Sequence, residues 1–173
     1  MDDLEKFIIL IKERNYDQAI SGLKIFIKKN KINTEALYLL ALSYQYNKNF
    51  SKSLETYKKS LEINKNFKTY DRMGEVCIKN NNFELAKKYF KISLSINKNN
   101  PITQNNLGLV LAHLNYELES IQHFKTAIEL DSEYIEPIYN LLEIYEKTNM
   151  LIELEKLVSF SMQRFDNNEV IKF

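Results

Sequence analysis

Apolar side chains recur at helical spacing along the chain, in blocks that are separated by short polar joins. Two consecutive blocks consist of Leu107, Val110, Leu111 and Leu114 and of Ile121, Phe124 and Ile128. Two of the joins, residues 47–49 and 80–82, are rich in asparagine, which accepts the left-handed conformation that ends many helices. The pattern therefore predicts helix hairpins, each made of two helices and a tight turn.

The hairpin pattern repeats along the chain with a period of about 34 residues. Segments that begin with asparagine and an aromatic residue come into register at 15–20, 49–54, 82–87 and 115–121. A single hairpin cannot bury its apolar side, so neighbouring hairpins are expected to stack. We therefore expect one array over residues 1–168, with units 1–33, 34–66, 67–100, 101–134 and 135–168, followed by a short C-terminal tail, 169–173.

Composition narrows the fold class to all-α. The 173 residues include only 3 Gly and 2 Pro, too few for the turns of a sandwich or barrel. The glycines are isolated, which excludes a glycine-rich phosphate loop. The charges nearly cancel to +1, so no global field recruits nucleic acid or an anionic membrane.

The spacing of small and aromatic residues resembles the tetratricopeptide repeat family. The second, third and fourth units carry its pattern as Leu40-Ala41, Tyr44, Ser53, Tyr57 and Ser60, as Met73-Gly74, Cys77, Ala86, Phe90 and Ser93, and as Leu107-Gly108, Leu111, Ser120, Phe124 and Ala127. The outer units depart from it, with Phe7 in a small slot of the first and Leu142 and Leu154 in two small slots of the last. The resemblance implies a right-handed superhelical solenoid of five antiparallel helix hairpins.

In this family the concave surface is lined by the first helix of each hairpin, so the resemblance implies a groove that binds a peptide or protein segment. By motif position the groove residues are Tyr38, Leu39, Leu42, Tyr46, Lys68, Arg72, Glu75, Asn105, Asn106, Leu109, His113 and Asn140. Tyr38, Leu42 and Tyr46 would be apolar anchors, and Lys68 and Arg72 would pair with a carboxylate. The alternative is that these residues only pack against neighbouring hairpins or form a solvated face.

Two narrower binding modes fit less well. One family variant clamps a chaperone's C-terminal carboxylate, but only Lys68 and Arg72 match, whereas Leu4, Ile8 and Leu39 occupy the other slots. A ladder of lysines at equivalent places on the second helices could follow a phosphate backbone, and it consists of Lys24, Lys58, Lys91 and Lys125. Arginines and exposed aromatic residues are not concentrated beside it, so nucleic-acid binding is not expected.

No constellation for catalysis, metal or cofactor binding emerges from the sequence. It lacks a serine elbow, a pair of cysteines and a His-Glu-x-x-His motif, and its two histidines, His113 and His123, lie ten apart. Cys77, the single cysteine, falls in an apolar stretch and fits a reducing compartment. With no signal-peptide core and no membrane span expected, we predict a non-enzymatic, cytoplasmic protein.

The C-terminal end suggests further alternatives. The last hairpin presents an apolar flank near Leu142, Leu154 and Val158, and the tail 169–173 resembles the opening of another first helix. A partly covered flank indicates a partner, self-association, for example as a homodimer, or a lost downstream domain. The final unit also resembles repeats that precede sulfotransferase or glycosyltransferase domains in bacterial proteins, so an accessory or substrate-docking arm of a transferase is the alternative function.

Overall fold

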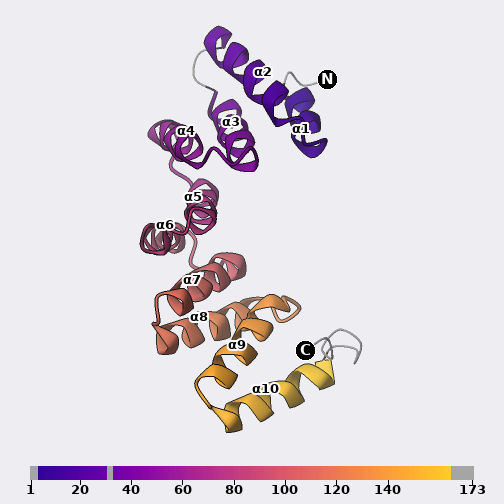
Figure 1. Cartoon of the computed structure of the whole chain (residues 1–173), viewed down its shortest axis with the longest axis vertical. Coiled ribbons are helices and arrows are strands. Elements are labelled where there is room, and N and C mark those ends of the chain that lie inside the picture. Colours follow the sequence, from indigo (N-terminus) through magenta and orange to yellow (C-terminus); the bar gives the residue numbers. More distant parts are fainter. Residues whose placement is uncertain (1–3, 31–32, 165–173) are drawn as a thin grey trace. The chain divides into compact units, whose positions relative to one another are not determined.

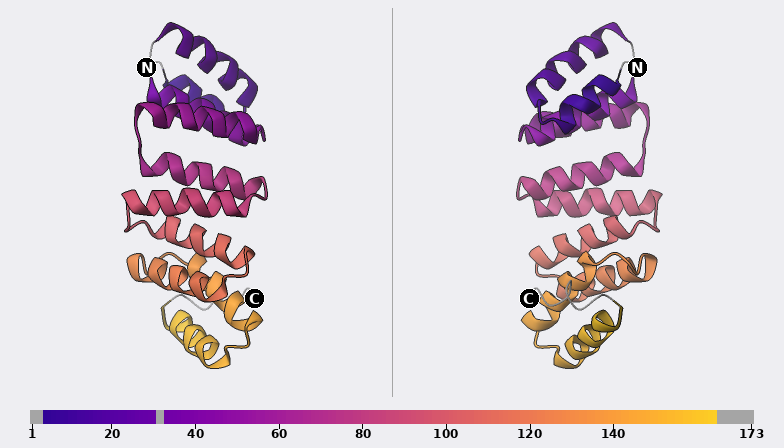
Figure 2. Two further views of the ribbon diagram at one scale, coloured as in Figure 1. Left: turned by 90° about the vertical axis from the view of Figure 1, so that its left-hand side faces the viewer. Right: turned by 90° about the vertical axis from the view of Figure 1, so that its right-hand side faces the viewer.

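The computed structural model describes residues 4–30 and 33–164, which form two compact units that divide between Asn97 and Lys98. The first unit contains six helices, each next to the following one (Figures 1 and 2). These helices are α1 (Glu5–Lys12), α2 (Tyr16–Lys29), α3 (Thr34–Tyr46), α4 (Phe50–Ile63), α5 (Phe67–Lys79) and α6 (Phe83–Ile96).

The second unit contains four helices in the same serial arrangement. They are α7 (Pro101–His113), α8 (Glu117–Leu130), α9 (Glu136–Lys147) and α10 (Leu151–Arg164). The described ranges thus hold helices and no strands, which confirms the all-α prediction and is consistent with five hairpins. The bounds of the five repeats and the extent of the array stay predictions, and the tail 169–173 lies outside the described residues.

The turn inside each hairpin contains one residue with a positive φ. These residues are Arg14, Lys48, Asn81, Asn115 and Asn149, with φ of 63°, 58°, 56°, 61° and 56°. Asparagine tolerates this left-handed conformation better than other side chains, which confirms the interpretation of the join at residues 80–82. In the join at residues 47–49 the left-handed residue is Lys48 and not an asparagine, so the expectation for that join is wrong in this detail. The repeat period places Arg14 and Lys48 at the position equivalent to Asn81.

Asparagine also begins several helices. The side chains of Asn33, Asn49, Asn66 and Asn82 each accept a hydrogen bond from the backbone N–H three residues further on, and Asn100 accepts from Ile102 and Thr103. Each bond satisfies a backbone donor that the first turn of a helix leaves without a partner. The abundance of asparagine therefore has a structural use that composition alone does not reveal.

Size complementarity holds the hairpins together. A Cβ atom added to Gly74 would lie 2.5 Å from the ring of Phe90, and one added to Gly108 would lie 2.7 Å from Phe124. Both rings are fully buried. The first hairpin reverses the arrangement, since Phe7 comes from the first helix and fits against Gly22 of the second. This exchange explains how Phe7 can occupy a position at which the repeat pattern has a small residue, because the small residue, Gly22, is on the other helix.

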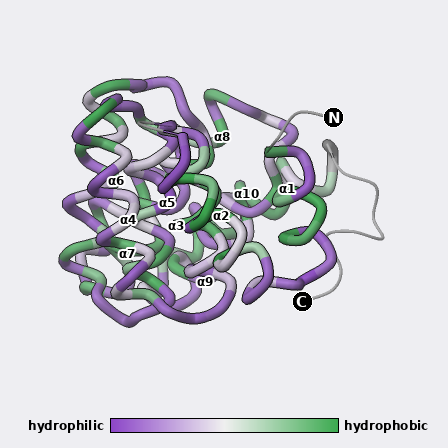
Figure 3. Tube along the Cα trace, turned by 90° about the horizontal axis from the view of Figure 1, so that it is seen from above, coloured by the Kyte–Doolittle hydropathy of each residue, from purple (hydrophilic) through white to green (hydrophobic). Residues whose placement is uncertain are grey.

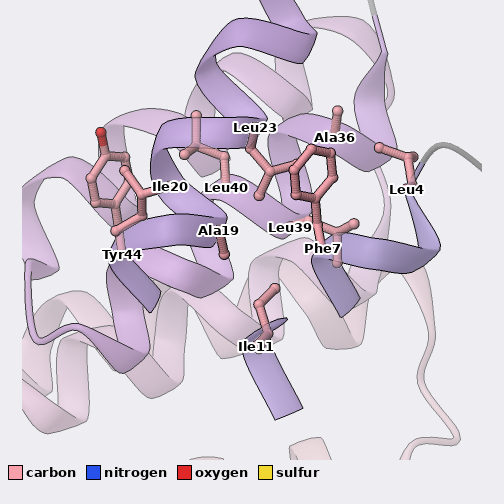
Figure 4. Packing of buried hydrophobic residues seen from close by; sticks show 10 residues of the cluster. All are labelled: Leu4, Phe7, Ile11, Ala19, Ile20, Leu23, Ala36, Leu39, Leu40 and Tyr44. Carbon is pink, nitrogen blue, oxygen red and sulfur yellow. The ribbon is translucent and has the colours of Figure 1, made fainter. Parts of the chain in front are cut away.

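The core of the first unit begins where α1, α2 and α3 meet. Side chains from the three helices and from Leu4 form one buried cluster (Figure 4), made of Leu4, Phe7, Ile11, Ala19, Ile20, Leu23, Ala36, Leu39, Leu40 and Tyr44. Apolar and polar stretches alternate along the chain (Figure 3), as expected for helices with one buried side. In the second unit, Ile121 and Phe124 of α8 pack with Leu141, Ile144 and Tyr145 of α9.

Candidate partner-binding site

The first helices of adjacent hairpins contact each other within each unit, α3 with α5 and α7 with α9. In the first unit, a polar cluster joins α3 to α5. Arg72 donates from Nε to the hydroxyl of Tyr38 at 3.2 Å and from a terminal nitrogen to Glu75 Oε2 at 2.8 Å. The side chains of Arg72 and Glu75 are 37% and 28% exposed, so this ion pair forms part of the surface.

The same cluster continues inward to α4. The buried Gln45 has its Nε2 atom 3.5 Å from Glu75 Oε2 and accepts a hydrogen bond from the hydroxyl of Tyr57 at 3.2 Å. The ring of Tyr57 contacts that of Tyr38 edge to face, with centroids 5.6 Å apart. Sequence reasoning missed Gln45 and gave Tyr57 only a packing role, because their partners come from other helices.

Electrostatics keep Arg72 charged in this cluster. Burial disfavours the guanidinium, but the Glu75 carboxylate and the Tyr38 hydroxyl outweigh burial and hold the pKa of Arg72 above its ordinary value. Burial also raises the pKa of the Tyr57 hydroxyl, which therefore stays neutral. The predicted pair of clamping cations is thus unequal, because Arg72 is already paired within the chain and Lys68 is exposed.

Tyr46 provides the most exposed aromatic surface among the predicted anchors, with 40% of its area exposed. Its ring stacks on Tyr16 of α2 at 5.7 Å, and Lys79 Nζ of α5 lies 5.6 Å from its centroid. Leu42 is half-buried and packs against the core cluster. Leu39 is 7% exposed and belongs to that core, so it has almost no surface to offer a partner.

In the second unit, an amide pair joins α7 to α9. Asn140 donates to Asn105 Oδ1 at 2.8 Å, and Asn105 donates to the hydroxyl of Tyr134 at 3.1 Å. Asn105 is 5% exposed, so it can contribute little contact area to a partner, and its hydrogen bond positions the more exposed Asn140. Asn106, on the same helix, is half-buried.

Leu109, His113 and Asn140 line one cavity of about 170 Å³ in the second unit. Its rim includes Glu117, which accepts a hydrogen bond from Lys147 at 3.3 Å. The backbone amide of Glu117 and the ammonium of Lys147 lower the pKa of this carboxyl group. Glu117 and Lys147 are 30 residues apart, so local spacing could not have revealed their pairing.

The described residues also bear on metal binding, on the lysine ladder and on membrane crossing. Within residues 4–30 and 33–164, no three His, Cys, Asp or Glu side chains gather where a metal ion could bind. His123 Nδ1 lies 2.7 Å from Gln104 Oε1. The ladder residues Lys24, Lys58, Lys91 and Lys125 are all exposed. No helix in the described part of the chain is both long and apolar enough to cross a bilayer.

Sequence models described as tetratricopeptide repeat match residues 34–67, 67–100 and 103–134, together more than half of the chain. The protein therefore belongs to the tetratricopeptide repeat family, and its fold is the all-α array of helix hairpins that defines this family. Proteins of this kind typically bind other proteins and carry no catalytic centre of their own. No curated protein matches the chain.

Solved structures of the same fold share little sequence with it. A crystal structure of the MamA protein has a TM-score of 0.84 at 16% identity and covers 99% of this chain and 94% of its own. Pseudomonas aeruginosa PilF has a TM-score of 0.80 at 16% identity, covering 97% and 78%. YrrB, described as a TPR protein with an unusual peptide-binding site, has a TM-score of 0.77 at 15% identity, covering 97% and 87%. Nothing in these likenesses supports a transferase arm.

Proposed function

We propose that this protein is a non-catalytic scaffold that binds a peptide or protein segment on the faces of its first helices, α3 and α5 in one unit and α7 and α9 in the other. The observation that carries the proposal is the cavity of the second unit. Three residues chosen by motif position, Leu109, His113 and Asn140, come from two helices and line it together. Its lining combines apolar side chains, such as Leu109 and Ile144, with polar and charged ones, so it has room for one apolar side chain of a partner with polar contacts around it.

Hydrogen bonds fix the polar side chains of both faces before a partner arrives. Asn105 holds Asn140 in the second unit, and Tyr38 and Glu75 hold Arg72 in the first. Ordering a flexible side chain on binding costs about 0.5–1.5 kcal/mol, and a side chain that is already held avoids most of that cost. Such preorganised groups favour binding of an extended segment or a helix.

The first unit contributes a face of mixed chemistry. Tyr46 provides an exposed ring, and Lys68 an exposed cation that can pair with a carboxylate of the bound segment. Arg72 can accept a second contact only while it keeps its bond to Glu75 or exchanges that bond for the new one. YrrB, a structure of this fold, is described as having an unusual peptide-binding site, which supports the proposal. The single cysteine, Cys77, is buried and fits a reducing compartment, so we place the scaffold in the cytoplasm.

Affinity capture with matched variants tests the proposal. The double variant Tyr46→Ala with His113→Ala removes exposed side chains from one face in each unit, and Tyr116→Ala removes a tyrosine of similar exposure, 44%, from a hairpin turn. We expect wild type and Tyr116→Ala to retain the same specific protein and the double variant to lose it. The double variant should melt at a lower temperature, because Tyr46 loses its contacts with Tyr16 and Lys79, but all three proteins should be fully folded at the temperature of the capture, as shown by equal circular dichroism. Equal retention by the double variant, or no specific retention by wild type, would contradict the proposal.

A further inference from the structure

The last hairpin lacks the interlock of small and aromatic residues that closes the hairpin before it. In the fourth hairpin, Phe124 covers Gly108, and Ser120 donates its hydroxyl hydrogen to the carbonyl of Gly108 at 2.8 Å. The positions 34 residues further are occupied by Val158, Leu142 and Leu154. Two leucines replace small residues and a valine replaces the ring, so the two helices meet differently.

An open cavity of about 600 Å³ lies between α9 and α10 as a result. The three substituted residues line it, and the remaining lining residues are Tyr139, Asn140, Glu143 and Glu146. The two helices form the last hairpin of the second unit (Figure 1).

This cavity occupies the position at which a further helix would pack. One repeat earlier, α9 packs against the cluster that includes Leu109, Ala112 and Phe124. The residues 34 positions further are Glu143, Glu146 and Val158, and all three line the cavity. The last hairpin therefore presents the surface on which the next helix packs one repeat earlier. Here the exposed carboxylates of Glu143 and Glu146 replace two apolar side chains.

The negative charge of Glu143 and Glu146 determines which kind of partner this cavity can bind. None of the lining residues that the structure describes is a lysine or arginine, and the nearby Lys147 is bonded to Glu117. Burying Glu143 and Glu146 against an apolar surface would leave two desolvated carboxylates without cations, which is strongly unfavourable. In a symmetric dimer this patch would meet its own copy and bring like charges together.

Exposed apolar surface continues along α10 beyond the cavity. Leu151 and Met162 share the helix face of Leu154 and Val158 and are 57% and 48% exposed. The exposed Ile152 and Phe160 lie on other sides of α10 and do not extend this face. An apolar area beside acidic residues fits a helix with one apolar face and basic residues along its edge. Lysine or arginine within one turn of the inserted apolar residue would reach the two carboxylates.

We propose that the cavity between α9 and α10 is a docking site for an amphipathic, basic helix of a partner protein. An apolar side chain of that helix enters between Leu142, Leu154 and Val158, and its lysine or arginine residues pair with Glu143 and Glu146. This site is additional to the first-helix faces of the proposed function and uses α10, which those faces do not include.

The experiment measures binding of a fluorescently labelled synthetic peptide by anisotropy at fixed ionic strength. The probe is an 18-residue amphipathic helix with leucines on one face and lysines beside them, and its matched control carries glutamates in place of the lysines. We expect the basic peptide to bind wild type and the acidic peptide to bind at least tenfold more weakly. Equal binding of the two peptides would overturn the proposal.

Two variants locate the peptide. Charge reversal, Glu143→Lys with Glu146→Lys, should weaken binding at least tenfold, whereas the same charge change at the exposed Glu13 and Glu62 of the first unit should weaken it less than threefold. Equal weakening by both reversals would show only a general charge effect and refute the site.

The second variant, Leu142→Gly with Val158→Phe, gives the last hairpin the glycine and the phenylalanine of the fourth and keeps Leu154. It should fill the cavity and abolish binding while helix content is kept.

Other occupants give distinct results. If light scattering shows a dimer of wild type that dissociates when the cavity is filled, a second copy occupies the cavity and the proposal is wrong. If the full chain fails to bind and a chain without residues 166–173 binds, the chain's own end occupies it, and the proposal is again wrong. The Tyr46→Ala variant should bind the basic peptide as wild type does, which separates this test from that of the proposed function.

Discussion

The substitution Gly74→Ala tests how the hairpins are held together. A Cβ at this position would lie 2.5 Å from Cε1 and Cζ of Phe90 and 2.9 Å from Cδ1. Carbon atoms do not approach so closely, so either the ring or α5 must shift. The ring is fully buried, and protein interiors are close-packed, so moving it disturbs the side chains around it.

The expected magnitude is the difference of two opposing effects. Alanine favours the interior of a helix over glycine by about 1 kcal/mol. Overpacking a filled core costs typically about 1–3 kcal/mol, and contact with three ring atoms indicates the upper end. The free energy of unfolding should therefore fall by about 2 kcal/mol. The second hairpin has Ala41 in the corresponding slot beside Tyr57, so the fold should be kept.

Denaturant unfolding followed by circular dichroism measures this change. The free energy of unfolding is extrapolated linearly to zero denaturant, and the slope against denaturant concentration should be the same for both proteins. Lys91→Gly compared with Lys91→Ala, at an exposed position of α6, supplies the intrinsic glycine cost in the same protein. Phe90→Leu should be partly compensated by Gly74→Ala, giving a favourable coupling energy of about 1 kcal/mol in a double-mutant cycle. Gly74→Ala would contradict the steric argument if it raised the free energy of unfolding by as much as Lys91→Ala exceeds Lys91→Gly.

Three further predictions concern stability. Lys48→Gly should raise the free energy of unfolding by about 0.5–1 kcal/mol in denaturant titrations, because glycine adopts a φ of 58° without strain. Burial raises the pKa of the Cys77 thiol from 9.0 to about 11, so the unfolded state loses this proton at a lower pH than the folded state does. As the pH rises from 9 to 11, the free energy of unfolding of wild type should therefore fall by roughly 2 kcal/mol relative to that of Cys77→Ala. A difference between the two proteins that does not change with pH would contradict this. Arg72→Ala should cost about 1 kcal/mol through its lost bonds to Tyr38 and Glu75, while Lys68→Ala, on the same helix, should change melting by less than half as much.

The periodic positions of the chain predicted the helices and the pairing of small with aromatic residues. Gly74 with Phe90 and Gly108 with Phe124 follow from spacing because the contacts recur at a fixed distance along the chain. The reversed pair of Phe7 and Gly22 breaks that spacing, so only the structure reveals it. The right-handed superhelical path over all five hairpins stays a prediction.

The candidate site was harder to derive from the sequence, because helical position does not determine burial. Leu39 and Leu42 lie three residues apart on α3, yet Leu39 belongs to the core and Leu42 is half-buried. Lys68 and Arg72 looked equivalent as cations. Glu75, three residues after Arg72, was a local signal that one of them would be paired.

We propose that a partner segment lies on the first-helix faces of the two units. Hydroxyl-radical footprinting of the chain, alone and with its captured partner, tests this claim most directly, because it reports the exposure of individual side chains. Binding should protect Tyr46 and His113 and leave Tyr116 and Leu118, on the α7–α8 turn and on α8, as reactive as before. Protection of Tyr116 and Leu118, with Tyr46 and His113 unchanged, would contradict the account.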